Sequence, residues 1–248
     1  PAKLRIYQEF LEETGFNSQD RYGLNGFIAK YWRIVTRDGQ LTPQAVPIDQ
    51  IGRERLQFES GMLDMLNVKY LIVNHLTLPD PRYKMVYTPS PWIYENTTAL
   101  PRAFFVDSTV TLTGRKAIFD YMRSGRFDPH RTAILEEKPA APIVAGAGNT
   151  VQMTSFDIHE IRLSAKVLQP ALMVLSEIYY PAGWKAYVDG RETKIYKTNY
   201  ILRSIQLSPG EHEIVFKFAP ASYRLGVWIS VLTLLLLLGL LAVQLFLR

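Results

Sequence analysis

The sequence predicts an α+β protein with a mixed region of helices and strands, followed by an antiparallel β-sandwich and one C-terminal transmembrane helix. Three features of the apolar spacing support this prediction. Helical and strand patterns mix in the first 138 residues, a period of two prevails after residue 149, and an unbroken apolar run lies near the end. With 248 residues and 48% hydrophobic content, the chain is long enough for one large core or two small ones.

The C-terminal run predicts a helix that spans a membrane. Gly226 to Leu247 is a stretch of 22 residues without a charge. As a helix it is ~33 Å long, enough to cross the roughly 30 Å hydrocarbon core of a bilayer. Its leucine, valine, isoleucine and phenylalanine side chains outweigh its few polar ones. We therefore assign residues 223–248 to a transmembrane helix with its flanks, and we expect the lipid bilayer as a partner.

The mixed α/β region is predicted over residues 1–138. Apolar residues recur at helical spacing over 1–14, 48–67 and 113–122. The run KYLIV, Lys69 to Val73, is apolar after its first residue, directly follows the second helix and predicts a buried strand. Short strands separated by Pro and Asn turns are expected at 83–108 and 132–137.

A linker and a sandwich domain are predicted after this region. Residues 139–149 are rich in Pro, Ala and Gly, the composition expected of a linker. Strand-length segments separated by short turns then fill residues 150–222, which is typical of an antiparallel sandwich. In the last of these segments, Ile214, Phe216 and Phe218 are expected on one face and Glu213 and Lys217 on the other, so one face of that strand should be buried.

The segment YYPAGWKAYVDGRE, residues 179–192, is predicted to form two turns around a short strand, with consecutive strands as neighbours in one sheet. Aromatic rings stack on the apolar faces of sugars, so Trp184 beside Asp189 could form a carbohydrate platform. Alternatively, Trp184 packs at the edge of the sandwich while Pro181 and Gly183 shape the turn. Both interpretations are compatible with the residues.

A second group of aromatic residues lies near the N-terminus, at Tyr22, Phe27, Tyr31 and Trp32. These side chains could line a substrate groove, or they could pack against neighbouring membrane helices, because aromatic residues often mark the headgroup interface. The candidate binding residues of the whole chain are therefore Tyr22, Tyr31, Trp32, Trp184 and Asp189.

The sequence gives little support to other kinds of chemistry. The chain contains no cysteine, and its four histidines lack the spacing of a metal site, so we expect neither a metal nor a cofactor. It has no nucleophile elbow, no phosphate-binding loop and no dinucleotide fingerprint, and no catalytic residue is assigned. The net charge of +5 is spread along the chain without a dense basic run, which argues against nucleic acid as a partner.

A series of motifs resembles the C-terminal region of bacterial YfhO-like membrane proteins. The motifs occur in the same order and cover nearly the whole chain. They are PAKLRIYQEFLE, MLDMLNVKYLIV, YENTTALPRAFFV, FDPHRTAILEE, LSEIYYPAGWKAYVDGRE and GEHEIVFKFAP, followed at once by the apolar run.

This resemblance implies a function that the residue patterns alone do not. YfhO-like proteins are similar to GT-C-type glycosyltransferases, polytopic enzymes that pass a sugar from a polyprenyl-phosphate donor to an acceptor outside the cytoplasm. In that architecture the catalytic carboxylate lies in an early loop that none of these motifs matches. The resemblance thus implies a non-catalytic extracytoplasmic module and the last span of a bacterial cytoplasmic-membrane protein.

The partners implied are the missing N-terminal transmembrane domain of the same protein and a polyprenyl-linked sugar or a cell-envelope glycan. An alternative is a membrane-anchored carbohydrate-binding or interaction module without enzymatic activity. A complete membrane-tethered hydrolase would need a pair of carboxylates, which no motif suggests. Because only Arg248 follows the apolar run, the distribution of positive charge does not fix the orientation of the helix in the membrane.

Overall fold

The computed structural model describes residues 61–73, 80–89, 91–145 and 148–246, together with Glu9 and Leu78. The helix predicted over residues 1–14 lies outside these ranges, except for Glu9, which is helical. Of the helix predicted over 48–67, residues 61–67 are described; residues 61–65 are helical and 66–67 form a turn.

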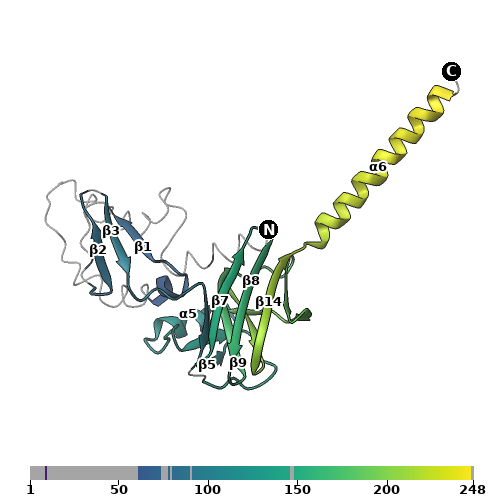
Figure 1. The fold of residues 1–248 in the computed structure, drawn as a ribbon. Helices are drawn as coiled ribbons and strands as arrows, with labels where there is room; N and C mark the ends of the chain where they lie inside the picture. Colours follow the sequence, from purple (N-terminus) through teal and green to yellow (C-terminus); the bar gives the residue numbers. More distant parts are fainter. Residues whose placement is uncertain are drawn as a thin grey trace.

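The strands and helices mostly follow the predicted segments (Figure 1). In chain order they are β1 (Tyr70–Val73), β2 (Tyr83–Tyr87), β3 (Trp92–Asn96), β4 (Ala103–Val106), β5 (Ser108–Thr111), α5 (Arg115–Arg123), β6 (Thr132–Leu135), β7 (Thr150–Phe156), β8 (Glu160–Val167), β9 (Ala171–Ile178), β10 (Trp184–Val188), β11 (Arg191–Thr193), β12 (Tyr196–Thr198), β13 (Leu202–Leu207), β14 (Gly210–Phe218) and α6 (Ala221–Phe246).

Three sheets are formed by the described strands. A three-stranded sheet has the order β1-β3-β2, a five-stranded sheet β11-β10-β14-β8-β7, and a six-stranded sheet β4-β9-β13-β12-β6-β5. Described neighbours pair antiparallel, except that β5 and β6 are parallel and are joined through α5. The α+β class with an antiparallel sandwich is therefore confirmed.

The six-stranded sheet curls back on itself. Its two edge strands, β4 and β5, are joined by the single residue Asp107. Six strands laid flat would separate these edges by roughly 24 Å, whereas two residues of extended chain span about 7 Å. The edges therefore meet near Asp107, and the chain passes from one edge to the other without a loop.

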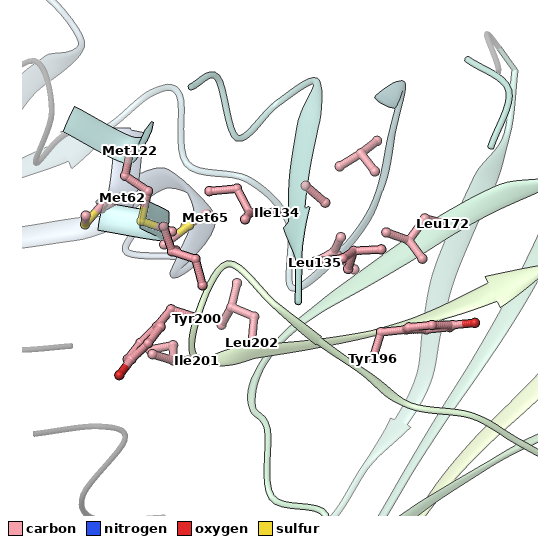
Figure 2. Close-up of a cluster of buried hydrophobic side chains, with 14 of the residues drawn as sticks. Met62, Met65, Met122, Ile134, Leu135, Leu172, Tyr196, Tyr200, Ile201 and Leu202 are labelled. Atoms are coloured by element: carbon pink, nitrogen blue, oxygen red, sulfur yellow. The ribbon is translucent and has the colours of Figure 1, made fainter. Parts of the chain in front are cut away.

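Both faces of the six-stranded sheet are buried. One face packs on the five-stranded sheet around a core formed by Ala103, Ile161, Leu163, Ala165, Val167, Ala171, Met173, Leu175, Ala186, Ile205, Leu207, Ile214 and Phe216. The other face packs on α5 and on helical residues 61–65. Part of this second core is drawn in Figure 2, where Met62, Met65 and Met122 approach Ile134 and Leu202. The result is three layers, with the continuous apolar run of β9 in the middle layer.

In the segment predicted as a linker, residues 139–149, Ala140 and Ala141 are hydrogen-bonded to the six-stranded sheet. The Ala141 N–H donates to Gln206 Oε1 at 3.1 Å, and Gln206 Nε2 donates to the Ala141 carbonyl at 2.6 Å. The Ala140 N–H donates to the Tyr196 hydroxyl at 3.1 Å. Strands from both sides of this segment share the six-stranded sheet.

Asn199 joins β6 to the turn between β12 and β13 through two hydrogen bonds. It lies in the turn between β12 and β13 with a positive φ of 48°. Its backbone N–H donates to the Ile134 carbonyl and its Oδ1 accepts from the Ile134 N–H, both at 2.8 Å. Asparagine tolerates this left-handed conformation and adds the side-chain acceptor, so one residue holds β6 beside the β12–β13 turn.

Two expectations about strands are wrong. β1 was expected to be buried, but it is an edge strand whose Tyr70 and Ile72 side chains are exposed. β9 and β10 were expected to be neighbours in one sheet, but β9 belongs to the six-stranded sheet and β10 to the five-stranded sheet. The short PAGW turn therefore crosses from one layer of the sandwich to the other.

α6 leaves the sandwich directly after its last strand. Only Ala219 and Pro220 separate Phe218, the end of β14, from the start of the helix. Figure 1 shows α6 projecting away from the sheets, and every α6 side chain that the structure describes is exposed. The helix is long and apolar enough to cross a membrane. It starts at Ala221, five residues before the apolar run that predicted it.

Candidate functional site

The end of the sandwich from which α6 emerges contains a cluster of aromatic rings, which we call the anchor cluster. It consists of Phe218 and three surrounding rings. The ring centroid of Phe218 lies 5.4 Å from that of Trp184, 6.3 Å from that of Tyr180 and 6.1 Å from that of His159. Since α6 begins three residues after Phe218, the cluster surrounds the origin of the apolar helix.

Backbone hydrogen bonds hold the same junction from two sides. The Phe218 N–H donates to the His159 carbonyl at 2.8 Å, and the Ala219 N–H donates to the Gly183 carbonyl at 2.7 Å. The two turns that flank β14, between β7 and β8 and between β9 and β10, therefore both bind the chain just before α6. Such bonds on both sides restrict the directions in which the helix can leave the sandwich.

Gly183 makes this packing possible. A Cβ atom at this position would lie 2.2 Å from the Phe218 ring, well inside van der Waals contact. Only glycine lets the turn approach the ring so closely. This explains the glycine of the PAGW segment through packing, since no unusual backbone conformation is required there.

Arg203 lies buried beneath the anchor cluster, with 1% of its surface exposed. Its guanidinium carbon is 4.2 Å from the centroid of the Trp184 ring and 5.2 Å from that of Phe216. Its Nη2 lies 3.9 Å from Glu177 Oε2, while Nε and Nη1 have no hydrogen-bond partner within the described part of the chain. Burial lowers the pKa of Arg203 to about 10, against the partial compensation from Glu177.

The energetic balance at Arg203 is unfavourable. A desolvated cation–π contact is worth about 2 kcal/mol, so the contacts with Trp184 and Phe216 together contribute about 4 kcal/mol at most. Against them stand three N–H groups on Nε and Nη1 that lack a partner within the described part of the chain. Each buried N–H group without a partner costs roughly 1–3 kcal/mol, and the lowered pKa shows that the protein disfavours the charge. A buried charge that weakens the fold is a feature found at functional sites, and it marks Arg203 as the strongest functional candidate that sequence reasoning missed. The available signal was the charged residue in the segment ILRSI, residues 201–205, where its neighbours are three apolar residues and one serine.

Asp189 lies at the other end of β10 from Trp184. The strand of five residues between them is about 17 Å long, so the predicted platform of Trp184 beside Asp189 is not assembled. Asp189 and Gly190 have φ values of 51° and 78°, as the predicted hairpin turn requires. Asp189 Oδ1 accepts from the Glu213 N–H at 2.9 Å, and Oδ2 lies 2.7 Å from His212 Nδ1.

His212 bridges two acceptors. Its Nδ1 faces the Asp189 carboxylate and its Nε2 lies 2.9 Å from the Ser208 carbonyl oxygen, so both nitrogens serve as donors when the ring is protonated. Burial by itself would lower the pKa of His212, but the hydrogen bonds to Asp189 and Ser208 outweigh it and raise the pKa. The hydrogen bonds from His212 and from the Glu213 N–H lower the pKa of Asp189.

A buried polar network joins the three-stranded sheet to the helical layer. Asp64 is buried in the helical residues 61–65; its Oδ1 accepts from Asn96 Nδ2 at 2.7 Å and its Oδ2 lies 3.3 Å from His130 Nε2. Asn96 Nδ2 also donates to the Val68 carbonyl at 3.1 Å. The motifs MLDML and FDPH, which are far apart in the sequence, therefore meet through Asp64 and His130.

The remaining predicted binding residues, Tyr22, Tyr31 and Trp32, lie outside the described residues. Binding by Trp184 and Asp189 stays a prediction, although the contacts of both side chains are with the protein itself. Among the residues that the structure describes, no group of three histidine, aspartate or glutamate side chains is placed to hold a metal ion.

Comparison with known proteins agrees with the resemblance seen in the motifs. A family model described as bacterial membrane protein YfhO matches residues 147–230, which span β7 to β14 and the first part of α6. The resemblance is confirmed for this part of the chain. No curated protein and no solved structure gives a significant match. The family match and the exposed apolar helix together support a location in a membrane.

Replacing Arg203 with methionine should leave the free energy of unfolding unchanged or raise it by about 1–4 kcal/mol, because a buried charge is exchanged for an apolar side chain. Glu177 would still have Arg102 as an ion-pair partner in this variant, since Arg102 Nη1 lies 2.8 Å from Glu177 Oε1. Urea unfolding of the full chain in detergent micelles measures the change. The control is Arg162→Met on the outer face of β8. A clear loss of stability in Arg203→Met alone would contradict the unfavourable balance.

The Asp189–His212 pair should stabilise the fold most between about pH 4 and 6.5. Because folding raises the pKa of His212, the stabilisation by its protonated ring is complete below the pKa that it has in the unfolded chain. This stabilisation is lost as the pH rises through the pKa that His212 has in the folded protein. Because folding lowers the pKa of Asp189, the stabilisation by its carboxylate is lost as the pH falls through the pKa that Asp189 has in the folded protein. Because the carboxylate is half exposed, Asp189→Asn should cost about 1 kcal/mol at most.

The free energy of unfolding is measured for the wild type and for Asp189→Asn between pH 3 and pH 9. The difference in free energy between the two proteins should become smaller at both ends of this range. Glu211→Gln is the control, since Glu211 Oε1 pairs with Lys166 at 3.5 Å and has no histidine partner. The effect of Glu211→Gln should not show the decline at high pH that is expected for Asp189→Asn. An Asp189→Asn effect that is equally flat would show that His212 is not charged in the folded protein.

Proposed function

We propose that this chain is the extracytoplasmic C-terminal module and last membrane span of a YfhO-like polytopic glycosyltransferase that uses a polyprenyl-phosphate sugar donor. The module is not itself catalytic. The observation that carries this proposal is the junction between β14 and α6, where a folded sandwich joins an exposed apolar helix through two residues within the region of the family match.

The position of the sandwich suits a reaction at a membrane surface. A polyprenyl-linked sugar is held in the bilayer by its lipid, so transfer occurs at the height of the headgroups. A module fastened directly to a membrane helix stays at that height and can hold or select an acceptor glycan or lipid there. The anchor cluster supplies the rigidity that such positioning needs.

The non-catalytic role is supported by the partners of three carboxylates in the described part of the chain. Asp64 and Asp189 have the partners given above, and Glu177 pairs with Arg102 at 2.8 Å. A carboxylate that serves as a general base or nucleophile must instead face a substrate. These three carboxylates are therefore given no catalytic role, and we assign catalysis to another part of the parent protein.

The test compares sugar transfer by two preparations in liposomes that contain a polyprenyl-phosphate-linked sugar and envelope acceptors. The complete protein encoded by the gene should transfer the sugar, whereas residues 1–248 alone should not. Because the chain lacks cysteine, Lys116→Cys gives one exposed thiol for labelling. A membrane-impermeant maleimide should label it in intact cells, and a matched cytoplasmic thiol should stay unlabelled.

Transfer by residues 1–248 alone would contradict the non-catalytic role, and labelling only after lysis would contradict the extracytoplasmic location. Glycan binding without transfer by the complete protein would favour the alternative, a membrane-anchored carbohydrate-binding module.

A further inference from the structure

The turn between β7 and β8 presents an apolar tip to solvent. Ile158, at the centre of the turn, has 81% of its surface exposed, and Phe156, at the end of β7, has 52% exposed. The turn itself is closed, because the Asp157 N–H donates to the Glu160 carbonyl at 2.8 Å and Asp157 Oδ1 accepts from the Ile158 N–H. The isoleucine side chain is thus held outward on a fixed backbone.

This tip lies at the end of the sandwich from which α6 emerges (Figure 1). Lys217 in β14 pairs with Glu160 in β8, and the Phe218 N–H donates to the carbonyl of His159, the residue after Ile158. The tip is therefore adjacent to the chain just before Ala219 and Pro220. Leu168, in the turn at the other end of β8, is 49% exposed and lies far from α6.

The first turns of α6 mark the level of the membrane surface. Tyr223 and Trp228 are exposed there, and such residues favour the interface between lipid and water. Trp228 lies about 10 Å along the helix from Ala221. The headgroup region adds about 5–8 Å on each side of the hydrocarbon core, so the base of α6 lies within or just outside it. A tip beside that base is at the same height.

The charges around the tip are compatible with a lipid surface. Asp157 caps the turn, and Glu160 is paired with both Arg162 at 2.6 Å and Lys217 at 3.5 Å. The Arg102 guanidinium carbon lies 4.6 Å from the centroid of the Phe156 ring. Glu160 is therefore neutralised by two cations, whereas Asp157 keeps its charge. Arg102, which also pairs with Glu177 at 2.8 Å, stands beside the exposed Phe156 ring, where lipid phosphates would be.

We propose that the β7–β8 turn rests on the bilayer beside α6, with Ile158 inserted among the lipid headgroups as a second contact with the membrane. A helix alone leaves the sandwich free to turn about the helix axis, whereas a second contact fixes which side of the module faces the lipid. The contact requires that α6 crosses the bilayer, but it does not depend on glycosyl transfer by the parent protein.

The test uses the full chain in vesicles of phosphatidylethanolamine and phosphatidylglycerol. The only cysteine is introduced as Ile158→Cys or, in the control, as Leu168→Cys, and each carries an environment-sensitive fluorophore. Both positions are exposed aliphatic residues in turns that flank β8, so neither change removes core packing. Lipids with a nitroxide on the headgroup should quench the fluorophore at 158 strongly and leave that at 168 almost unchanged, while aqueous iodide should show the reverse.

Equal quenching at the two positions, or iodide access to 158 as complete as to 168, would overturn the proposal. The labelled proteins must also float with the vesicles, and failure of both to float would overturn it as well, because the tip would have no bilayer beside it. Loss of sugar transfer by the parent protein with normal quenching at 158 would refute only the proposed function.

Discussion

The packing of Phe218 is the interaction on which the rest of this structure depends. Its ring lies among those of Trp184, Tyr180 and His159, and the backbone on either side is bonded to two turns of the sandwich. The chain has only two further residues before α6 begins. A long apolar helix would otherwise be a loose tether, but here its direction is coupled to the sheets. Functions that need a defined height or orientation above a membrane follow from that coupling.

The six-stranded sheet provides the rigid body to which the helix is coupled. Because it is buried on both faces, each fully buried leucine, isoleucine or methionine of β9 and β13 adds about 1.5–3 kcal/mol to stability. That margin allows the unfavourable burial of Arg203 next to Trp184, which an all-apolar core would avoid. Arg203 lies at the end of the sandwich that adjoins α6, far from the Asp189 turn.

Periodicity in the sequence predicted most elements of the described chain, because strands such as β14 and helices such as α5 bury one face and reveal it by spacing. It failed where burial is not periodic or where contacts are distant. β9 is apolar on both faces, so nothing in its residues indicated that β10 belongs to another layer. β4 pairs with β9 and β6 pairs with β12, although these strands are far apart in the sequence. The contact of Asp64 with His130 also joins distant segments. The alternation of apolar and polar residues within a segment does not show which distant segment it will pair with.

Coupling between the sandwich and a membrane-spanning helix can be measured directly. Ser164 on the outer face of β8 and Ser230 in α6 are exposed, and the absence of cysteine allows a nitroxide at each through Ser→Cys changes. Double electron–electron resonance on the doubly labelled chain in lipid nanodiscs should give one narrow distance distribution, with the label at 230 inaccessible to water-soluble relaxation agents. A broad distribution, or a label at 230 that remains in water, would contradict a rigid module carried on a helix that crosses the bilayer.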